Sequence, residues 1–204
     1  AAGGGSICRF DGIKLAVGPE SAGADPGPAC YGRGGPLCVT DLNLLLGRIA
    51  TEHFPFALDR SAVEQRLAEI AAQVDAALGE KMSLLELAAG LLAIANANMV
   101  RAVRGVSVAQ GENPSDYCLV AFGGAGAQHA CAVARELGIR SVLNHPDAGI
   151  LSAYGLGHAD ITRHAAVGIA KLTNDVELDE LHGIFDELTA QPRQEIIAEG
   201  IVDD

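Results

Sequence analysis

The sequence predicts an α/β fold. The first observation is a strand–turn–helix–strand pattern: an apolar run at Tyr117–Phe122, a turn at Gly123–Gly126, a helix at Ala127–Leu137 and a strand at Arg140–Leu143. Two strands joined in this way form a parallel βαβ unit with a right-handed crossover. The continuous apolar run predicts that the first strand is buried on both faces. The second observation is composition: 49% of the residues are hydrophobic, only 4% are aromatic and Trp is absent, which favours closely packed helices and parallel strands.

The first part of the chain predicts a β-hairpin followed by a long loop. Strands at Ser6–Phe10 and Lys14–Val17 flank Asp11-Gly12, a hairpin turn signal. Residues 18–36, which we call the glycine–proline loop, contain six Gly and four Pro in nineteen positions. No helix or central strand tolerates that content, so an extended loop is expected from residue 18 onward. Thr40 then caps a short helix that reaches Leu46.

Two longer helices follow. Ser61 with Glu64 predicts a capping box, and Gly79 ends that helix. Ser83 with Glu86 predicts a second capping box that opens a helix running to about Val103. This helix is apolar but contains Glu86, Asn96 and Asn98, so it is interpreted as a core helix and not as a membrane span.

The last part of the chain predicts a loop with a short helix at Ala148–Asp160, a strand near Ala165–Ile169 and an amphipathic helix at Val176–Glu199. The apolar residues of that last helix are expected to face inward: Leu178, Leu181, Ile184, Phe185 and Leu188. The chain thus divides into segments 1–58 (hairpin, loop and short helix), 59–116 (helical) and 117–204 (α/β with the C-terminal helix). Because it opens without Met and stops just after a helical pattern, we expect it to be a fragment of a larger protein.

Charge and cysteine usage exclude some classes of partner. The net charge is −12, with no basic stripe, which argues against a nucleic-acid partner. The five cysteines are odd in number and lack zinc spacing, and no signal peptide is visible. We therefore predict a reducing, cytoplasmic location, no metal site in this chain and no membrane contact.

The glycine turn (Gly123–Gly126) has two interpretations from pattern alone. A strand that ends in glycines and feeds a helix brings unhindered backbone next to a helix N-terminus, where a nucleotide can approach closely. Alternatively, the glycines serve only a tight bend. A P-loop is excluded because no Gly-Lys-Ser/Thr follows. A dinucleotide fingerprint is disfavoured because His129 occupies its third glycine position, although Asp147 is suitably spaced for a ribose contact.

Three separated motifs occur in order along the chain: Gly18–Gly32, Thr40–Asn43 and Phe122–Ala130. Together they resemble the hydantoinase A/5-oxoprolinase family, over residues 2 to about 160. The stretches that look closer to the 5-oxoprolinase branch are Glu52–Pro55, Gln128–Cys131 and Leu151–Gly155.

This resemblance implies part of an actin-like ATPase fold, built on ribonuclease-H-like halves, with a helical insertion. It implies ATP-dependent opening of a cyclic amide such as 5-oxoproline, with Mg²⁺ and, as a further candidate, K⁺ in the intact enzyme. It places the adenosine at Gly123, Gly124, Ala125 and Gly126, with Gln128 and His129 as neighbours. The remaining portions of the enzyme, or a second subunit, are the expected partners.

Several points stay open. The phosphate-binding hairpins of this fold are not recognisable here, so the isolated piece is expected to be inactive; Gly3–Ser6 is a candidate for the tail of that region. Glu20, Asp25 and Asp41 are weak catalytic candidates, since acids in such loops commonly satisfy backbone N–H groups. The alternatives for function are a hydantoinase component, a ketone carboxylase component, and a non-catalytic α/β interaction module.

Overall fold

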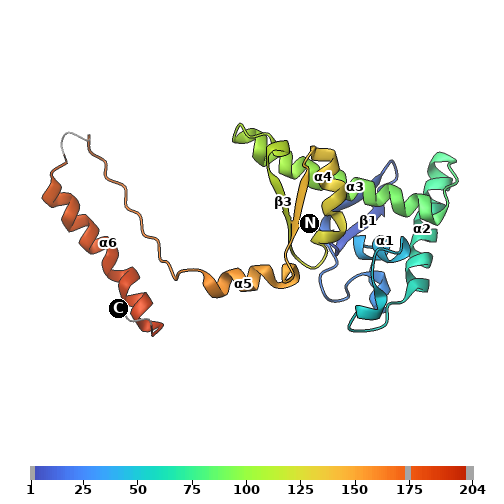
Figure 1. Ribbon diagram of the computed structural model, residues 1–204, viewed down its shortest axis with the longest axis horizontal. Coiled ribbons are helices and arrows are strands. Elements are labelled where there is room, and N and C mark those ends of the chain that lie inside the picture. Colours follow the sequence, from blue (N-terminus) through green and yellow to red (C-terminus); the bar gives the residue numbers. More distant parts are fainter. Residues whose placement is uncertain (1–2, 173–175, 201–204) are drawn as a thin grey trace. The chain divides into compact units, whose positions relative to one another are not determined.

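The computed structural model describes residues 3–172 and 176–200 (Figure 1). Its contacts divide the chain into a unit of residues 1–153 and a second unit of residues 154–204. The first unit contains the predicted segments 1–58 and 59–116 and the start of segment 117–204. The terminal residues 1–2 and 201–204, which contribute to the expectation of a longer protein, lie outside the described part.

The N-terminal hairpin forms as predicted but is longer. Strand β1 (Ser6–Phe10) pairs antiparallel with β2 (Leu15–Ser21). The turn between them is held by the Asp11 carboxylate, which accepts hydrogen bonds from the N–H groups of Ile13 (3.0 Å) and Lys14 (2.9 Å). The prediction that the loop begins at residue 18 is wrong. Pro19 fits in β2 because, within the part of the chain that the structure describes, this strand pairs only with β1, so its other edge requires no N–H donor.

The first helix, α1 (Val39–Leu45), follows the 3₁₀ helix η1 (Ala29–Tyr31). Cys38 occupies the N-cap position, so the prediction of a Thr40 cap is wrong. The Thr40 hydroxyl lies inside the helix and donates instead to the carbonyl oxygen of Gly4 at 3.0 Å. This side chain therefore joins the helix to the N-terminal glycines.

Helix α2 (Arg60–Leu78) follows the short 3₁₀ helix η2 (Thr51–His53). Its cap is Asp59, whose carboxylate accepts the N–H of Ala62 at 3.1 Å. The predicted Ser61–Glu64 capping box is wrong, because Ser61 already lies in the helix and its hydroxyl donates to Asp59 at 2.6 Å. The predicted end at Gly79 is confirmed, with Gly79 in the left-handed region at φ 68°.

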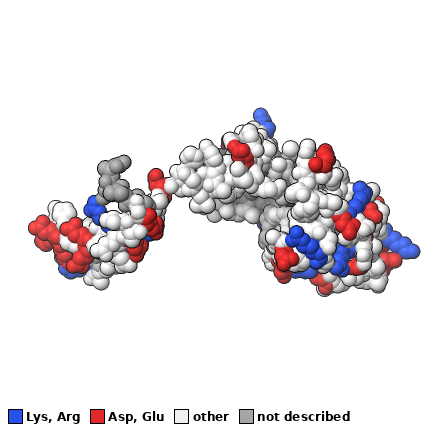
Figure 2. Space-filling view, turned by 90° about the horizontal axis from the view of Figure 1, so that it is seen from below, with Lys and Arg blue, Asp and Glu red and all other residues white. Residues whose placement is uncertain are grey.

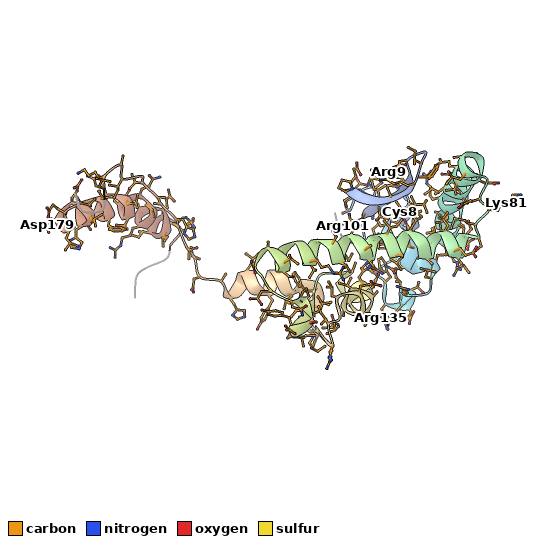
Figure 3. All side chains as sticks on the ribbon, turned by 90° about the horizontal axis from the view of Figure 1, so that it is seen from above. Cys8, Arg9, Lys81, Arg101, Arg135 and Asp179 are labelled. Carbon is orange, nitrogen blue, oxygen red and sulfur yellow. The ribbon has the colours of Figure 1, made fainter. Side chains whose placement is uncertain are left out.

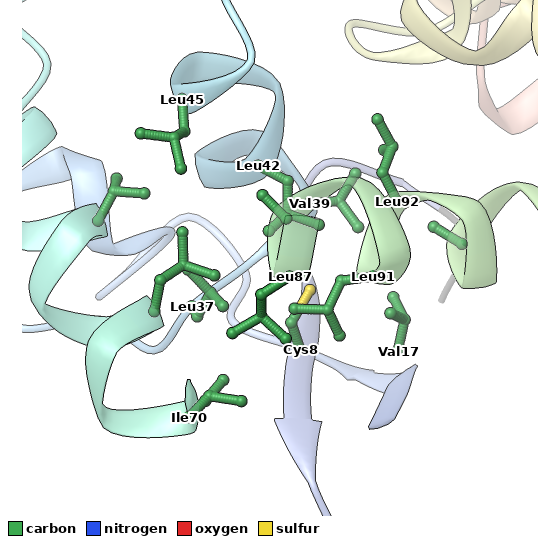
Figure 4. Close-up of a cluster of buried hydrophobic side chains, with 14 of the residues drawn as sticks. Cys8, Val17, Leu37, Val39, Leu42, Leu45, Ile70, Leu87, Leu91 and Leu92 are labelled. Atoms are coloured by element: carbon green, nitrogen blue, oxygen red, sulfur yellow. The ribbon is translucent and has the colours of Figure 1, made fainter. Parts of the chain in front are cut away.

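Helix α3 (Leu84–Ala109) has the predicted Ser83–Glu86 capping box and extends one and a half turns beyond Val103. It is long and apolar enough to cross a membrane by length and composition. Its buried face packs instead against α1, α2 and β2, which identifies it as the core helix of the first unit (Figures 1 and 4). The fully buried members of this core include Val39, Leu42, Val63, Leu67, Leu87 and Leu91.

The predicted βαβ unit is confirmed. After the 3₁₀ helix η3 (Pro114–Asp116), strand β3 (Cys118–Ala121) leads through the glycine turn into α4 (Gly126–Leu137), and β4 (Ser141–Asn144) pairs parallel to β3. The prediction that the first strand is buried on both faces is wrong. Val120 is 46% exposed and Phe122 is 56% exposed, because β3 pairs with β4 alone within the described residues and α4 covers one face.

The chain continues through the 3₁₀ helix η4 (Ala148–Ile150) into helix α5 (Leu151–His158), as predicted. Residues 165–169 form no strand, so that prediction is wrong; no other described segment pairs with them. Helix α6 (Leu178–Ala198) is confirmed, with acidic side chains gathered on its unit (Figure 2). Leu178 and Phe185 are 71% and 58% exposed, whereas Leu181, Ile184 and Leu188 are half-buried, so the predicted inward face is only partly covered within this unit.

The cap of α2 generates a stability prediction. Asp59→Ala removes the acceptor of an N-terminal N–H and is expected to lower the free energy of unfolding by about 1 kcal/mol. Ser61→Ala, two positions along, removes an exposed hydroxyl that donates to the Asp59 carboxylate but leaves the acceptor of the Ala62 N–H in place, and is expected to cost less than half as much. Urea unfolding of the 204-residue chain, followed by circular dichroism, measures both. Equal losses would contradict the assignment of Asp59 as the cap.

Candidate functional site

The glycine turn lies where β3 ends and α4 begins, and two backbone hydrogen bonds fix its shape. The N–H of Gly123 donates to the carbonyl of Ala148 at 2.8 Å, and the N–H of Gly126 donates to the carbonyl of Gly123 at 3.3 Å. Gly123 has φ 82°, a left-handed conformation that disfavours other residues. Glycine at position 123 is therefore required by the backbone itself.

Gly124 has no such requirement. Its φ is not in the left-handed region, and a Cβ built on it would meet no atom within 4 Å. Among the described residues, no group accepts a hydrogen bond from the N–H of Gly124 or of Ala125. The turn therefore presents open space and two free N–H donors at the start of α4, where the helix dipole favours an electron-rich ligand.

The N-terminal glycines and the start of α1 meet at this turn. A Cβ built on Gly4 would lie 2.5 Å from Thr40 Oγ1 and 3.5 Å from Ala125 Cβ. Glycine at position 4 is thus needed for a close approach of three segments that are far apart in the sequence. Sequence reasoning missed this contact, because nothing in the pattern of Gly3–Ser6 specifies which segment it packs against.

Four buried polar atoms have no hydrogen-bond partner within the described residues: Nδ2 and Oδ1 of Asn43, Oε1 of Gln128 and Nε2 of His129. Asn43 lies one helical turn beyond Thr40, and Gln128 and His129 lie one turn beyond Ala125. Leaving a buried polar atom unpaired costs about 1–3 kcal/mol, so such atoms are rare unless water or a ligand satisfies them. The sequence had indicated Gln128 and His129; Asn43, although inside the Thr40–Asn43 motif, had no distinguishing signal.

His129 connects α4 to the core helix. It is 2% exposed, and its Nδ1 lies 2.8 Å from Oδ1 of Asn96 on α3. Burial lowers the pKa of His129, and the positive charge of Arg48 lowers it further. The imidazole is therefore neutral, with Nδ1–H donating to Asn96, and Nε2 is left as a free acceptor.

The three acidic candidates occupy different environments. Glu20 is exposed and pairs with Arg9 at 2.5 Å; its own backbone N–H, followed by the Arg9 guanidinium, holds the pKa of Glu20 below its usual value. Asp25 is exposed on the glycine–proline loop. Only Asp41 is buried, at 0% exposure. The structure therefore brings Asp41, of the Thr40–Asn43 motif, into contact with the Gly18–Gly32 motif.

Asp41 binds the backbone of the glycine–proline loop. Its Oδ2 accepts the N–H of Ala29 (3.0 Å) and of Cys38 (2.7 Å), and its Oδ1 accepts the N–H of Cys30 (2.8 Å). We call this arrangement the Asp41 clamp. Burial raises the pKa of Asp41, while the three N–H donors favour the carboxylate. Asp41 is fully buried and its carboxylate holds backbone N–H groups in place, so a structural role for Asp41 follows.

Cys30 is fully buried beside this carboxylate. Burial, followed by the hydrogen bond to Asp41, raises the pKa of its thiol well above the usual range. A nucleophilic cysteine needs the opposite shift. Cys30 therefore belongs to the core.

A strand, a glycine turn with free N–H groups and a helix, joined to a parallel neighbour, define a class of α/β protein that binds ligands at the carboxyl ends of its strands. Two solved structures share the fold. The ATP-dependent caprolactamase of Pseudomonas jessenii is 33% identical, with a TM-score of 0.68 over 99% of this chain and 30% of that one. A nucleotide-free acetone carboxylase is 24% identical, with a TM-score of 0.75 over 100% of this chain and 30% of that one. The fold is of the actin-like ATPase type.

The family model described as "Hydantoinase/oxoprolinase" matches residues 1–165. A relative from Pestalotiopsis fici, named 5-oxoprolinase PfmaA, is 42% identical over 97% of this chain. The chain belongs to the hydantoinase/oxoprolinase family, and it spans 16% of the length of that relative.

The Asp41 clamp generates a second prediction. Asp41→Ala leaves three buried N–H groups without an acceptor and is expected to lower the free energy of unfolding by about 3–5 kcal/mol. Asp41→Asn can keep one oxygen at the Oδ2 position for Ala29 and Cys38, so it is expected to cost about half as much. Denaturant unfolding measures the two losses, with Glu80→Ala, at an exposed acid, as the control. A loss below 1 kcal/mol for Asp41→Ala would show that the clamp is not structural.

Proposed function

We propose that the intact protein uses ATP to open a cyclic amide, and that this chain contributes the adenosine-binding side of its nucleotide site. The observation that carries the proposal is Gly124. Neither its backbone conformation nor its surroundings require glycine. Unlike Gly105, which is equally open but lies within α3, Gly124 lies at the end of a strand where the N–H groups of Gly124 and Ala125 have no acceptor among the described residues, so we attribute the missing side chain to a ligand that approaches the backbone.

The geometry of the turn fits a nucleoside. The free N–H groups of Gly124 and Ala125 can donate to ribose or base oxygens and nitrogens, and the absence of a Cβ at position 124 lets a flat ring approach the backbone. Gln128 and His129, each with an unpaired buried acceptor, lie in the following turn of α4. We propose that these two side chains position the turn beneath the ligand.

The proposed substrate is a cyclic amide of the 5-oxoproline type. The relative from Pestalotiopsis fici is named a 5-oxoprolinase, and the structural neighbour from Pseudomonas jessenii is named a caprolactamase. Both names denote lactams. Amides resist attack by water, and ATP would supply the free energy that activates the carbonyl carbon. The contribution of this chain is to hold and orient the nucleoside.

Mg²⁺ and K⁺ remain predictions for the intact enzyme. Within residues 3–172 and 176–200, no three His, Cys, Asp or Glu side chains converge on one point. The cytoplasmic location is also proposed, because Cys8, Cys30 and Cys38 are buried in one region as free thiols, as in a reducing compartment.

The nucleotide proposal is tested by Gly124→Val in the full-length protein. Because a Cβ at position 124 meets no protein atom within 4 Å, the substitution should be tolerated, and the unfolding temperature is measured to check that the variant stays folded. The added isopropyl group should block the ligand, so ADP affinity in isothermal titration should fall at least 100-fold, which corresponds to about 2.7 kcal/mol.

Gly105→Val is the matched control. Gly105 also has open space around it and no left-handed φ, but it lies on α3. It should leave ADP binding unchanged. If Gly124→Val binds ADP like wild type, the turn is a bend only, and the alternative of a non-catalytic α/β interaction module gains support.

The substrate proposal is tested by ATP-dependent phosphate release from the full-length protein. We expect 5-oxoproline to stimulate release at least tenfold more than caprolactam, hydantoin, or acetone with bicarbonate. Preferred stimulation by hydantoin or by acetone with bicarbonate would replace the substrate assignment by one of the two family alternatives, while the ADP result above would still stand.

A further inference from the structure

A cavity lies in the groove between α3 and α4. It has a volume of about 520 Å³. Its α3 wall includes Ala93, Asn96, Ala97 and Arg101, and its α4 wall includes Ala132 and Arg135. The three alanines keep the groove open, because none of them has a side chain that reaches across.

Arginine side chains dominate the charge of this cleft. Arg101, Arg104 and Arg135 line it together with a single acid, Glu136. Figure 3 shows Arg101 on α3 and Arg135 on the neighbouring α4. Three positive charges against one negative charge is an unusual local balance in a chain whose net charge is −12, and it produces a local field that attracts anions.

Two of these guanidinium groups have no protein partner. Arg104 donates through Nη2 to the carbonyl of Glu136 at 2.9 Å, which fixes its position at the end of α4. Among the described residues, Arg101 and Arg135 form neither an ion pair nor a hydrogen bond. Both therefore have all five N–H donors available.

Another cavity of the first unit provides a comparison. The pocket of about 470 Å³ between the hairpin and α2 is also lined by two arginines, Arg9 and Arg66. There, Arg9 pairs with Glu20 and Arg66 pairs with Glu69 at 3.1 Å. Both arginines of that pocket are paired with an acid, whereas, within the described part of the chain, Arg101 and Arg135 of the α3–α4 cleft are not.

Asn96 adds neutral donors to the cleft. Its Oδ1 is occupied by Nδ1–H of His129, while its Nδ2 has no acceptor among the described residues and the residue lines the cleft. The lining thus combines two free guanidinium forks with an amide donor. Guanidinium groups bind planar or tetrahedral oxyanions through paired N–H···O bonds.

We propose that the α3–α4 cleft binds a small oxyanion, a carboxylate or a phosphate, through Arg101 and Arg135, with Asn96 as a further donor. The site is separate from the glycine turn, and the proposal does not depend on the proposed function. The size of the cleft suits a small molecule. Carboxylates and phosphates both present oxygen atoms that can accept paired hydrogen bonds from a guanidinium group.

The test is isothermal titration of the full-length protein with sodium phosphate and, separately, sodium glutamate, at constant ionic strength. Gly124→Val is used as the background, so that any phosphate bound at the glycine turn is removed from the signal. We expect at least one anion to bind, and Arg101→Gln with Arg135→Gln to weaken it at least tenfold. The anion that binds more tightly shows whether the ligand is a phosphate or a carboxylate.

Arg140→Gln is the control for each single substitution, since Arg140 is exposed and lies outside the cleft, and the change removes one positive charge, as Arg101→Gln or Arg135→Gln does alone; it should leave binding unchanged. Arg135→Lys keeps the charge but not the fork, and should weaken binding at least threefold even if the double variant fails to fold. Absence of binding by both anions, as when an acidic segment of the intact protein fills the cleft, would overturn the proposal. Binding that Arg101→Gln, Arg135→Gln and Arg135→Lys leave unchanged would overturn it as well.

Discussion

The carboxylate of Asp41 connects the parts of the first unit on which the rest depends. It accepts N–H groups from Ala29 and Cys30 of the glycine–proline loop and from Cys38, the N-cap residue of α1. A loop rich in Gly and Pro forms few hydrogen bonds of its own, so an internal carboxylate supplies the acceptors that a strand or helix partner would otherwise supply. The cost of burying this charge is offset by three short contacts.

The Asp41 clamp also determines how the candidate site is arranged. Because the clamp fixes the start of α1, Thr40 reaches the carbonyl of Gly4, and Gly4 in turn lies against Ala125 of the glycine turn. The turn is also held from the opposite side by the Gly123–Ala148 hydrogen bond. The N-terminal glycines and the three motifs seen separately in the sequence thus form one connected region, in which Gly124 is exposed.

Local patterns predicted local structure well. The Ser83–Glu86 box and the Gly79 stop are present, because each depends on residues within one or two turns. The βαβ unit is present as well, because its strand, helix and second strand follow one another directly along the chain. Predictions failed where a neighbour decided the outcome. The N-cap of α2 is Asp59 and not Ser61. Pro19 lies in strand β2, whose outer edge requires no N–H donor. Val120 and Phe122 are exposed because no described element covers them. The Gly4–Thr40–Ala125 contact and the α3–α4 cleft could not be predicted, since both join residues tens of positions apart.

The contrast between Gly4 and Gly124 has a consequence for how variation in this protein should be interpreted. A side chain at position 4 would collide with Thr40, whereas a Cβ at position 124 would meet no protein atom within 4 Å. Under selection for folding alone, Gly124 would drift to alanine and larger residues while Gly4 stayed fixed. Under selection for function, both would remain glycine. An alignment would show two equally invariant columns with different causes, and only a library screened for stability without activity would separate them.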